Sequence, residues 1–209
     1  MLVTRLLEHF DCYTRLHIDV NDVRDHLVKM GVQDEIRFHF VKMDAAKIRG
    51  IIYQYSKHAA VYGDAVLCSE IVIANDMGSE DEYWKRLVAV KELLHVMDCP
   101  KISAESEDSV GIIFENFSLP PELRNDLYNG AKNTKSYMND RMRIYLALAV
   151  LIPLGCREPL RELYETKKLN DQEIADITKI PKRYVSVVMG SKFEDSIAAF
   201  LAWEEQNQE

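Results

Sequence analysis

The sequence contains few of the residues that characterise irregular or covalently cross-linked proteins. Its 209 residues include only eight Gly, six Pro and four Cys. The low Gly and Pro content excludes collagen-like and low-complexity chains. The four cysteines are scattered without a CxxC pair, which favours reduced thiols over a disulfide framework or a cysteine zinc site.

Long apolar runs and an excess of basic residues are also missing. The longest nearly apolar run, residues 144–154, is well short of the roughly 20 residues that span a bilayer. Residues 1–10 carry charges within their apolar stretch and do not resemble a signal peptide. Lys and Arg total 26 against 34 Asp and Glu, a net charge of -8, which disfavours a general binder of nucleic acid. We therefore expect a cytoplasmic protein without a membrane partner.

The residues that are present have the balance of a folded protein, with 47% hydrophobic and 29% charged. Their periodicity predicts an α+β fold, in which a small, mainly antiparallel sheet packs on a helical core and a helical bundle follows. We place a first domain at residues 1–155 and a helical subdomain at 156–209, with an acidic linker or lid at 99–118. Helices are predicted at 2–10, 20–30, 80–97 and 139–152, and strands at 36–41, 50–55 and 65–74.

The helix predicted at 80–97 contains a pattern related to zinc-peptidase helices. Residues 91–95 are Lys-Glu-Leu-Leu-His, whereas a metallopeptidase helix has His-Glu-x-x-His. In that motif two His one turn apart hold a metal ion, and the Glu polarises the water bound to the metal. Glu92 and His95 have the spacing of the Glu and the second His, but Lys91 stands at the first ligand position.

With its flanking segments, this helix resembles the ImmA/IrrE family of zincin-like metallopeptidases. A strand at 71–73 precedes the motif, and residues 139–153 are similar to the family's second metal helix, which ends in Leu-Leu-Met-Pro. A helical tail follows that proline. The resemblance covers residues 35–190, and it implies a zincin-like core and a role in regulation or in a phage- or mobile-element-linked setting.

The departures from the family pattern concern the metal ligands. Carried over residue by residue, the resemblance makes His95 a metal ligand and Glu92 the catalytic base. The family's ligand glutamate falls at Met142, and Lys91 replaces the first His. A protonated lysine has no lone pair to donate, and a catalytic zinc site uses three protein ligands. We therefore expect a decayed site and no cofactor, with zinc bound only if an unusual ligand set keeps the site functional.

Two roles are open for Lys91. If the fold is kept, its ammonium lies near the metal position, where it would pair with Glu92 or another acid and replace the charge of the metal. In the alternative, the side chain of Lys91 extends to solvent. The sequence does not distinguish between these roles.

A second motif lies in the tail, where residues 169–189 resemble a helix-turn-helix. The first helix would be capped by Asn170 or Asp171, and a turn at 180–181 would precede the second helix. Residues 167–192 contain six Lys and Arg against three Asp and Glu, which is compatible with phosphate contacts. The same geometry also packs small helical subdomains. The candidate DNA contacts are Lys179, Lys182, Arg183 and Ser186.

An aromatic stripe marks the predicted last helix, which carries Phe193, Phe200 and Trp203. In the simpler interpretation the stripe docks this helix on the rest of the chain. In the alternative it forms a contact between copies in a homo-oligomer.

Three functions follow from these patterns. We favour a metallopeptidase-like protein with a decayed zinc site, which acts by binding and regulation through a protein partner. The second is a DNA-binding transcriptional regulator that uses residues 171–189. The third is an active zinc metallopeptidase with an unusual ligand set.

Overall fold

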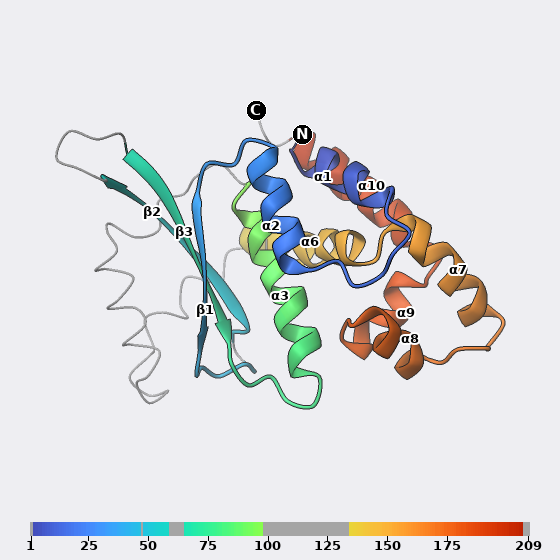
Figure 1. The fold of residues 1–209 in the computed structure, drawn as a ribbon. Coiled ribbons are helices and arrows are strands. Elements are labelled where there is room, and N and C mark those ends of the chain that lie inside the picture. The colour runs from blue at the N-terminus through green and yellow to red at the C-terminus, as the bar shows by residue number, and fades with distance from the viewer. Residues whose placement is uncertain (1, 47, 59–64, 98–133, 207–209) are drawn as a thin grey trace.

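The computed structural model describes residues 2–46, 48–58, 65–97 and 134–206 (Figure 1). The linker predicted at 99–118 lies outside these residues. Within them the predicted α+β class is confirmed. The elements, in chain order, are α1 (Leu2–Asp11), α2 (Val20–Lys29), β1 (Glu35–Val41), β2 (Gly50–His58), β3 (Ala65–Ala74), α3 (Asp81–His95), α6 (Thr134–Leu151), α7 (Leu154–Glu165), α8 (Asp171–Thr178), η3 (Lys182–Tyr184), α9 (Val185–Val188) and α10 (Phe193–Gln206).

The sheet is mixed, which corrects the prediction of a mainly antiparallel sheet. Its strand order is β1-β3-β2, with β1 parallel and β2 antiparallel to β3. The last seven residues of β3 are all buried. A strand that is buried on both faces lies at the centre of a sheet, so the two earlier strands flank it and one pairing becomes parallel.

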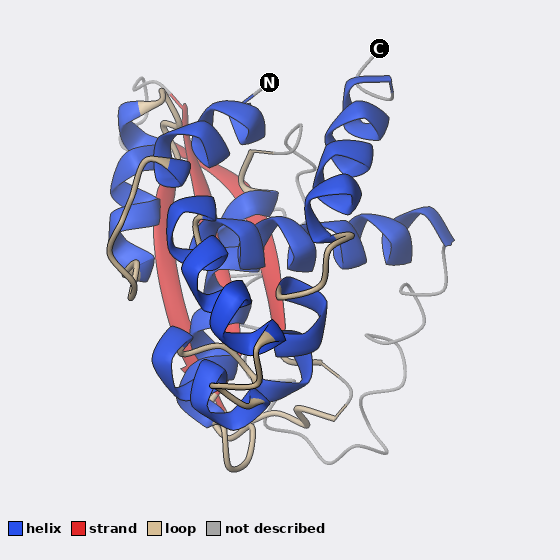
Figure 2. Cartoon of the chain, turned by 90° about the vertical axis from the view of Figure 1, so that its right-hand side faces the viewer, coloured by secondary structure: helices blue, strands red, loops and turns tan. Residues whose placement is uncertain are grey.

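The helices cover one face of the sheet, as Figure 2 shows. Alternation along β3 directs Ile71 and Ile73 toward the helices, where they join the main hydrophobic core. Cys68 and Val72 face the other way and pack with Tyr53 and Tyr55 in a smaller cluster. The sheet thus separates a helical layer from a second, more polar face.

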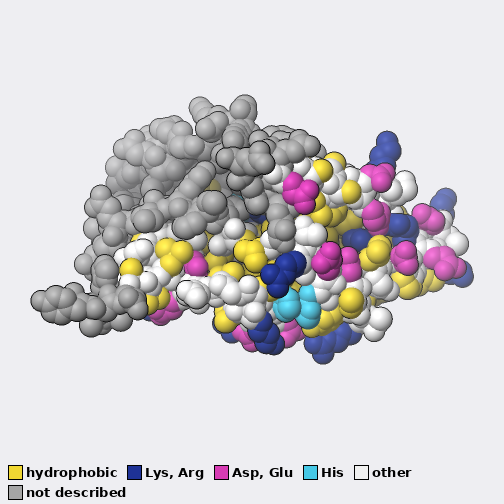
Figure 3. All heavy atoms as spheres, turned by 90° about the horizontal axis from the view of Figure 1, so that it is seen from above, with side chains coloured by type: hydrophobic (Ala, Val, Ile, Leu, Met, Phe, Trp, Pro, Cys, Tyr) yellow, Lys and Arg dark blue, Asp and Glu magenta, His cyan; other side chains and the backbone are white. Residues whose placement is uncertain are grey.

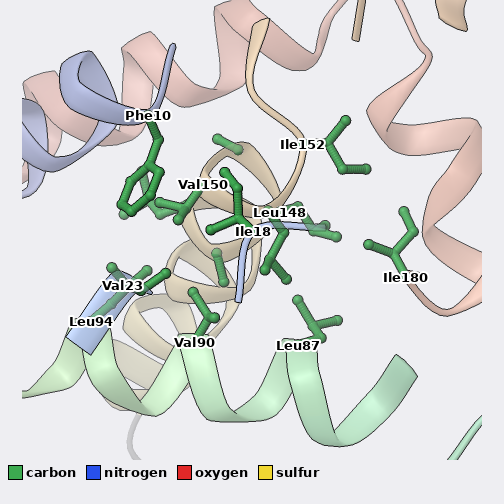
Figure 4. Close-up of a cluster of buried hydrophobic side chains, with 14 of the residues drawn as sticks. Phe10, Ile18, Val23, Leu87, Val90, Leu94, Leu148, Val150, Ile152 and Ile180 are labelled. Atoms are coloured by element: carbon green, nitrogen blue, oxygen red, sulfur yellow. The ribbon is translucent and has the colours of Figure 1, made fainter. Parts of the chain in front are cut away.

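The main core lies between α3 and the helices that pack on it (Figure 4). α6 is buried along its C-terminal half, where every residue from 146 to its end at 151 is buried, as its apolar pattern predicts. The boundary at 155–156 stays a prediction, although one buried cluster includes residues on both sides of it. Labelled members of this cluster are Phe10, Ile18, Val23, Leu87, Val90, Leu94, Leu148, Val150, Ile152 and Ile180.

The first helices begin close to the predicted residues. α2 begins at Val20, and the Asp19 carboxylate caps it by accepting a hydrogen bond from the Asn21 backbone at 2.7 Å. α3 begins at Asp81, with Glu80 at its N-cap and no side-chain cap. α6 begins at Thr134, five residues earlier than predicted. No helix in the described ranges is long and apolar enough to cross a membrane.

Candidate functional site

The middle of α3 carries a buried ion pair at the predicted site. The Lys91 ammonium lies 2.9 Å from Glu92 Oε1, and the two residues are only 9% and 2% exposed. The alternative in which Lys91 extends to solvent is therefore wrong. The angles of this contact are not those of a hydrogen bond, so Glu92 Oε1 accepts no hydrogen bond from the described residues. The contact is therefore an ion pair, in which the ammonium of Lys91 balances the charge of the carboxylate.

Gly50, which the sequence patterns did not single out, brings this pair close to the sheet. It begins β2 and lies against Val88 and Glu92, one turn apart on α3. A Cβ atom at position 50 would be 2.2 Å from Val88 Cγ1 and 2.9 Å from Glu92 Oε1. No side chain fits at this separation, so glycine is required for the helix to approach the strand.

The other two predicted residues lie on the same pair of helices. His95 is the last residue of α3 and is half-buried. Met142 is on α6 and is 3% exposed. α3 packs on α6 more extensively than on any other described helix. The structure thus joins Lys91 to Glu92, places His95 one turn beyond Lys91, and puts Met142 on the neighbouring helix.

This donor set does not fit zinc. The ammonium of Lys91 is engaged with Glu92, and Met142 offers a thioether, a ligand that zinc sites in proteins rarely use. Across the described part of the chain, no three His, Cys, Asp or Glu side chains are grouped to hold a metal ion. What the described residues show at this position is an ion pair between Lys91 and Glu92.

The predicted helix-turn-helix has a regular first half and a short second half. Asn170 caps α8, and Glu173 completes a capping box. Lys182 and Arg183 are exposed as predicted, and so is Ser186. The second half consists of the 3-10 turn η3 and the four residues of α9. This is short for a recognition helix in a DNA groove.

The tail docks on the N-terminal half of α3. Glu80 accepts a hydrogen bond from the Lys182 backbone at 2.9 Å, and the hydroxyl of Tyr83 donates to Asp176 at 3.0 Å. Lys179 lies over the ring of Tyr83 at 5.4 Å. One of the candidate DNA contacts, Lys179, is therefore directed at the helical core.

A polar cluster on the far face of the sheet was not predicted. Glu70 is 3% exposed and accepts a hydrogen bond from the Tyr55 hydroxyl at 2.9 Å. Arg37 Nη1 donates to the same oxygen at 3.4 Å, and the other carboxylate oxygen lies 2.5 Å from His39 Nε2. The alternation of polar residues along β1 is a signal in the sequence that this face is polar. The cluster itself forms only because β1 and β2 both pair with β3, which carries Glu70.

The edge of that face is also charged. Hydrogen bonds from Lys57 and Arg37 hold the pKa of Glu35 below its usual value, and the same bond raises the pKa of Lys57. Burial raises the pKa of Cys68, so its thiol stays protonated and is a poor nucleophile.

The aromatic stripe docks α10 inside the chain, as the simpler interpretation predicts. The ring of Phe193 stacks on Tyr145 of α6 at 5.9 Å, and Phe200 meets the same ring edge-on at 5.3 Å. Arg157 covers Phe193 at 4.8 Å. The side chain of Trp203 lies outside the described residues.

Comparison of the chain with protein-family models, with curated protein sequences and with solved structures finds no match. The resemblance to the ImmA/IrrE family therefore depends on the residues of α3 and α6 described above.

Proposed function

We propose that the chain is a metallopeptidase-like protein of ImmA/IrrE type that acts by binding a protein partner rather than by proteolysis. The observation that carries this proposal is the buried ion pair between Lys91 and Glu92. In this proposal the ammonium takes the place of the metal's positive charge, next to the residue that would serve as catalytic base.

The ion pair opposes peptidase chemistry at this position. The ammonium of Lys91 lies 2.9 Å from the carboxylate that would act as the base, so it occupies the place next to Glu92 where a metal-bound water would be needed. The lysine also supplies no lone pair at the first ligand position. In this proposal, what remains of the site is a framework for binding.

DNA binding is a second candidate because Lys182, Arg183 and Ser186 are exposed. Its support is weaker, since the net charge of -8 repels a duplex. On the face shown in Figure 3, acidic and basic side chains are interspersed over the described part. A protein partner therefore fits the observed charge distribution better.

Metal analysis tests the first proposal. Protein purified without chelator is expected to contain zinc well below one atom per chain, and His95→Ala is expected to leave that content unchanged. His26→Ala, which removes a histidine from α2, is the matched control. One zinc per chain, lost in His95→Ala and kept in His26→Ala, would contradict the proposal and favour an active peptidase.

A further inference from the structure

A cavity of about 490 Å³ lies beside the N-terminal half of α3, away from Lys91 and Glu92. Its walls come from residues 17–21, β1, α3 and the end of α8. Figure 1 shows these segments meeting where the lower part of α3 passes between the sheet and the tail. The volume is within the range of roughly 300–1,000 Å³ found for small-molecule sites.

Arg86 gives this cavity a positive charge. Its guanidinium donates to the carbonyl oxygens of Ile18 at 2.9 and 3.2 Å, Thr178 at 2.8 Å and Lys179 at 3.1 Å. Burial lowers the pKa of Arg86 to about 10, with the charge of Asp19 acting in the opposite direction, so Arg86 remains charged at neutral pH. Among the described residues, these four bonds leave one of its five N–H groups for a ligand.

Three further basic residues line the same cavity, His17, Lys85 and Lys179. Burial and the charges of Arg86 and Lys179 lower the pKa of His17, so at neutral pH its imidazole is neutral and offers an N–H group rather than a charge. Two acids line it as well: the Asp19 carboxylate caps α2 and its charge acts on Arg86, and Glu82 pairs with Lys85 at 3.2 Å. Lys85, Arg86 and Lys179 thus outnumber the two acids in the lining, in a chain whose net charge is -8.

Backbone strain coincides with this charge. Among the described residues three non-glycine residues have positive φ, and two of them, His17 at 69° and Lys179 at 54°, line the cavity. Lys179 adopts this conformation as the left-handed C-cap of α8. Residues with such conformations cluster at ligand sites, and here two of them lie at the wall of one cavity.

The opposite wall is aromatic. Phe38 and Phe40 are two residues apart on β1, so they share the face of the sheet that looks toward α3. Phe40 is 55% exposed, which is unusual for a side chain of this size. A planar apolar group in the cavity would cover it.

We propose that this cavity binds a small organic anion, a carboxylate or phosphate ester of a planar apolar group. The anionic group contacts His17, Arg86 and Lys179, and the apolar group packs on Phe38 and Phe40. This site goes beyond the function proposed above and does not depend on it, because none of its residues belongs to the ion pair.

Titration with four probes tests the chemistry of the site. Phenyl phosphate and benzoate represent the two anionic groups, benzyl alcohol is the neutral analogue, and inorganic phosphate lacks the apolar group. Backbone amide NMR is expected to show saturable shifts at residues 17–21 and 179 with phenyl phosphate or benzoate, and none with benzyl alcohol. The tighter of the two anions identifies the ligand class. Absence of saturable binding by both anions at millimolar concentration would overturn the proposal.

Matched variants test the residues. Lys179→Asn removes the charge and suits the left-handed backbone, and Lys192→Asn is an exposed control outside the cavity. We expect about tenfold weaker binding of the tighter anion to Lys179→Asn and no change in Lys192→Asn. Phe40→Ala should weaken phenyl phosphate but not inorganic phosphate, whereas Val28→Ala, another exposed apolar position, should change neither. Equal affinities in Lys179→Asn and Lys192→Asn would contradict the assignment.

Discussion

The two halves of α3 hold a buried cation in opposite ways. In the C-terminal half, Lys91 lies against the carboxylate of Glu92. In the N-terminal half, Arg86 lies against neutral carbonyl oxygens of the tail and of the segment before α2. The charge of Lys91 is balanced by a carboxylate of the same helix, whereas Arg86 lines a cavity that we propose to bind an anion. One helix therefore carries an internal ion pair and a candidate ligand site.

Replacement of Lys91 should have the largest effect on stability. Lys91→Met leaves the buried carboxylate of Glu92 without its partner, so we expect a loss of about 3–5 kcal/mol in the free energy of unfolding. Urea denaturation measures this loss. Lys85→Met, which breaks ion pairs with Asp81 and Glu82 on the same helix, is the control and should cost under about 1 kcal/mol. Equal losses of stability in the two variants would contradict the view that the buried pair of Lys91 differs from the more exposed pairs of Lys85.

Arg86 is the corresponding test in the N-terminal half. Arg86→Met removes hydrogen bonds to three carbonyl oxygens, and we expect a loss of about 2–4 kcal/mol by the same measurement. Arg86→Lys keeps the charge but loses the planar fork. If the carbonyl bonds dominate, Arg86→Lys is nearly as destabilised as Arg86→Met. A fully stable Arg86→Lys would show instead that charge alone is needed.

Gly50→Ala tests the contact between α3 and β2. The added Cβ would lie 2.2 Å from Val88 Cγ1, so the helix has to move and we expect a loss of about 1–3 kcal/mol. Gly31→Ala, where nothing lies within 4 Å, controls for a glycine replacement without a clash. Because Gly31 has φ +104°, its own loss reports backbone strain alone. Thermal unfolding of Gly50→Ala at or above the wild-type midpoint would contradict the close approach.

The smallest effect is expected in the tail. Lys182→Ala with Arg183→Ala removes two exposed charges, and we expect a change within about 0.5 kcal/mol in stability. Gel-shift assays with genomic fragments at two salt concentrations are expected to show no duplex binding near 0.15 M salt. Binding that the double variant weakens, with a flatter salt dependence, would support the DNA-binding alternative instead.

Features that depend on local pattern were predictable, and features that depend on strand order were not. The helices α3 and α6 and the burial of α6 follow from the sequence. The parallel pairing of β1 with β3 does not, because periodicity gives the faces of a strand but not its neighbours. The cluster around Glu70 therefore escaped prediction.

The two sites of α3 differ in the same way. Lys91 and Glu92 are adjacent in the sequence, so a motif could suggest their pairing. The cavity around Arg86 combines residues 17–21, 38–40, 82–89 and 179. The sequence does not show that these segments meet. Only the docked tail brings Lys179 to the cavity and the carbonyl oxygens of residues 178 and 179 to Arg86.

Zinc affinity of the double variant Lys91→His with Met142→Glu tests the central claim most directly. If Lys91 stands in for a metal and α6 faces it, this change rebuilds a site from two His and a Glu beside Glu92. Isothermal titration should then show tight binding of one zinc per chain to the folded variant, and weak or no binding to the wild type. A well-folded variant that binds zinc no more tightly than the wild type would contradict the placement of Lys91 and Met142 at a former metal position.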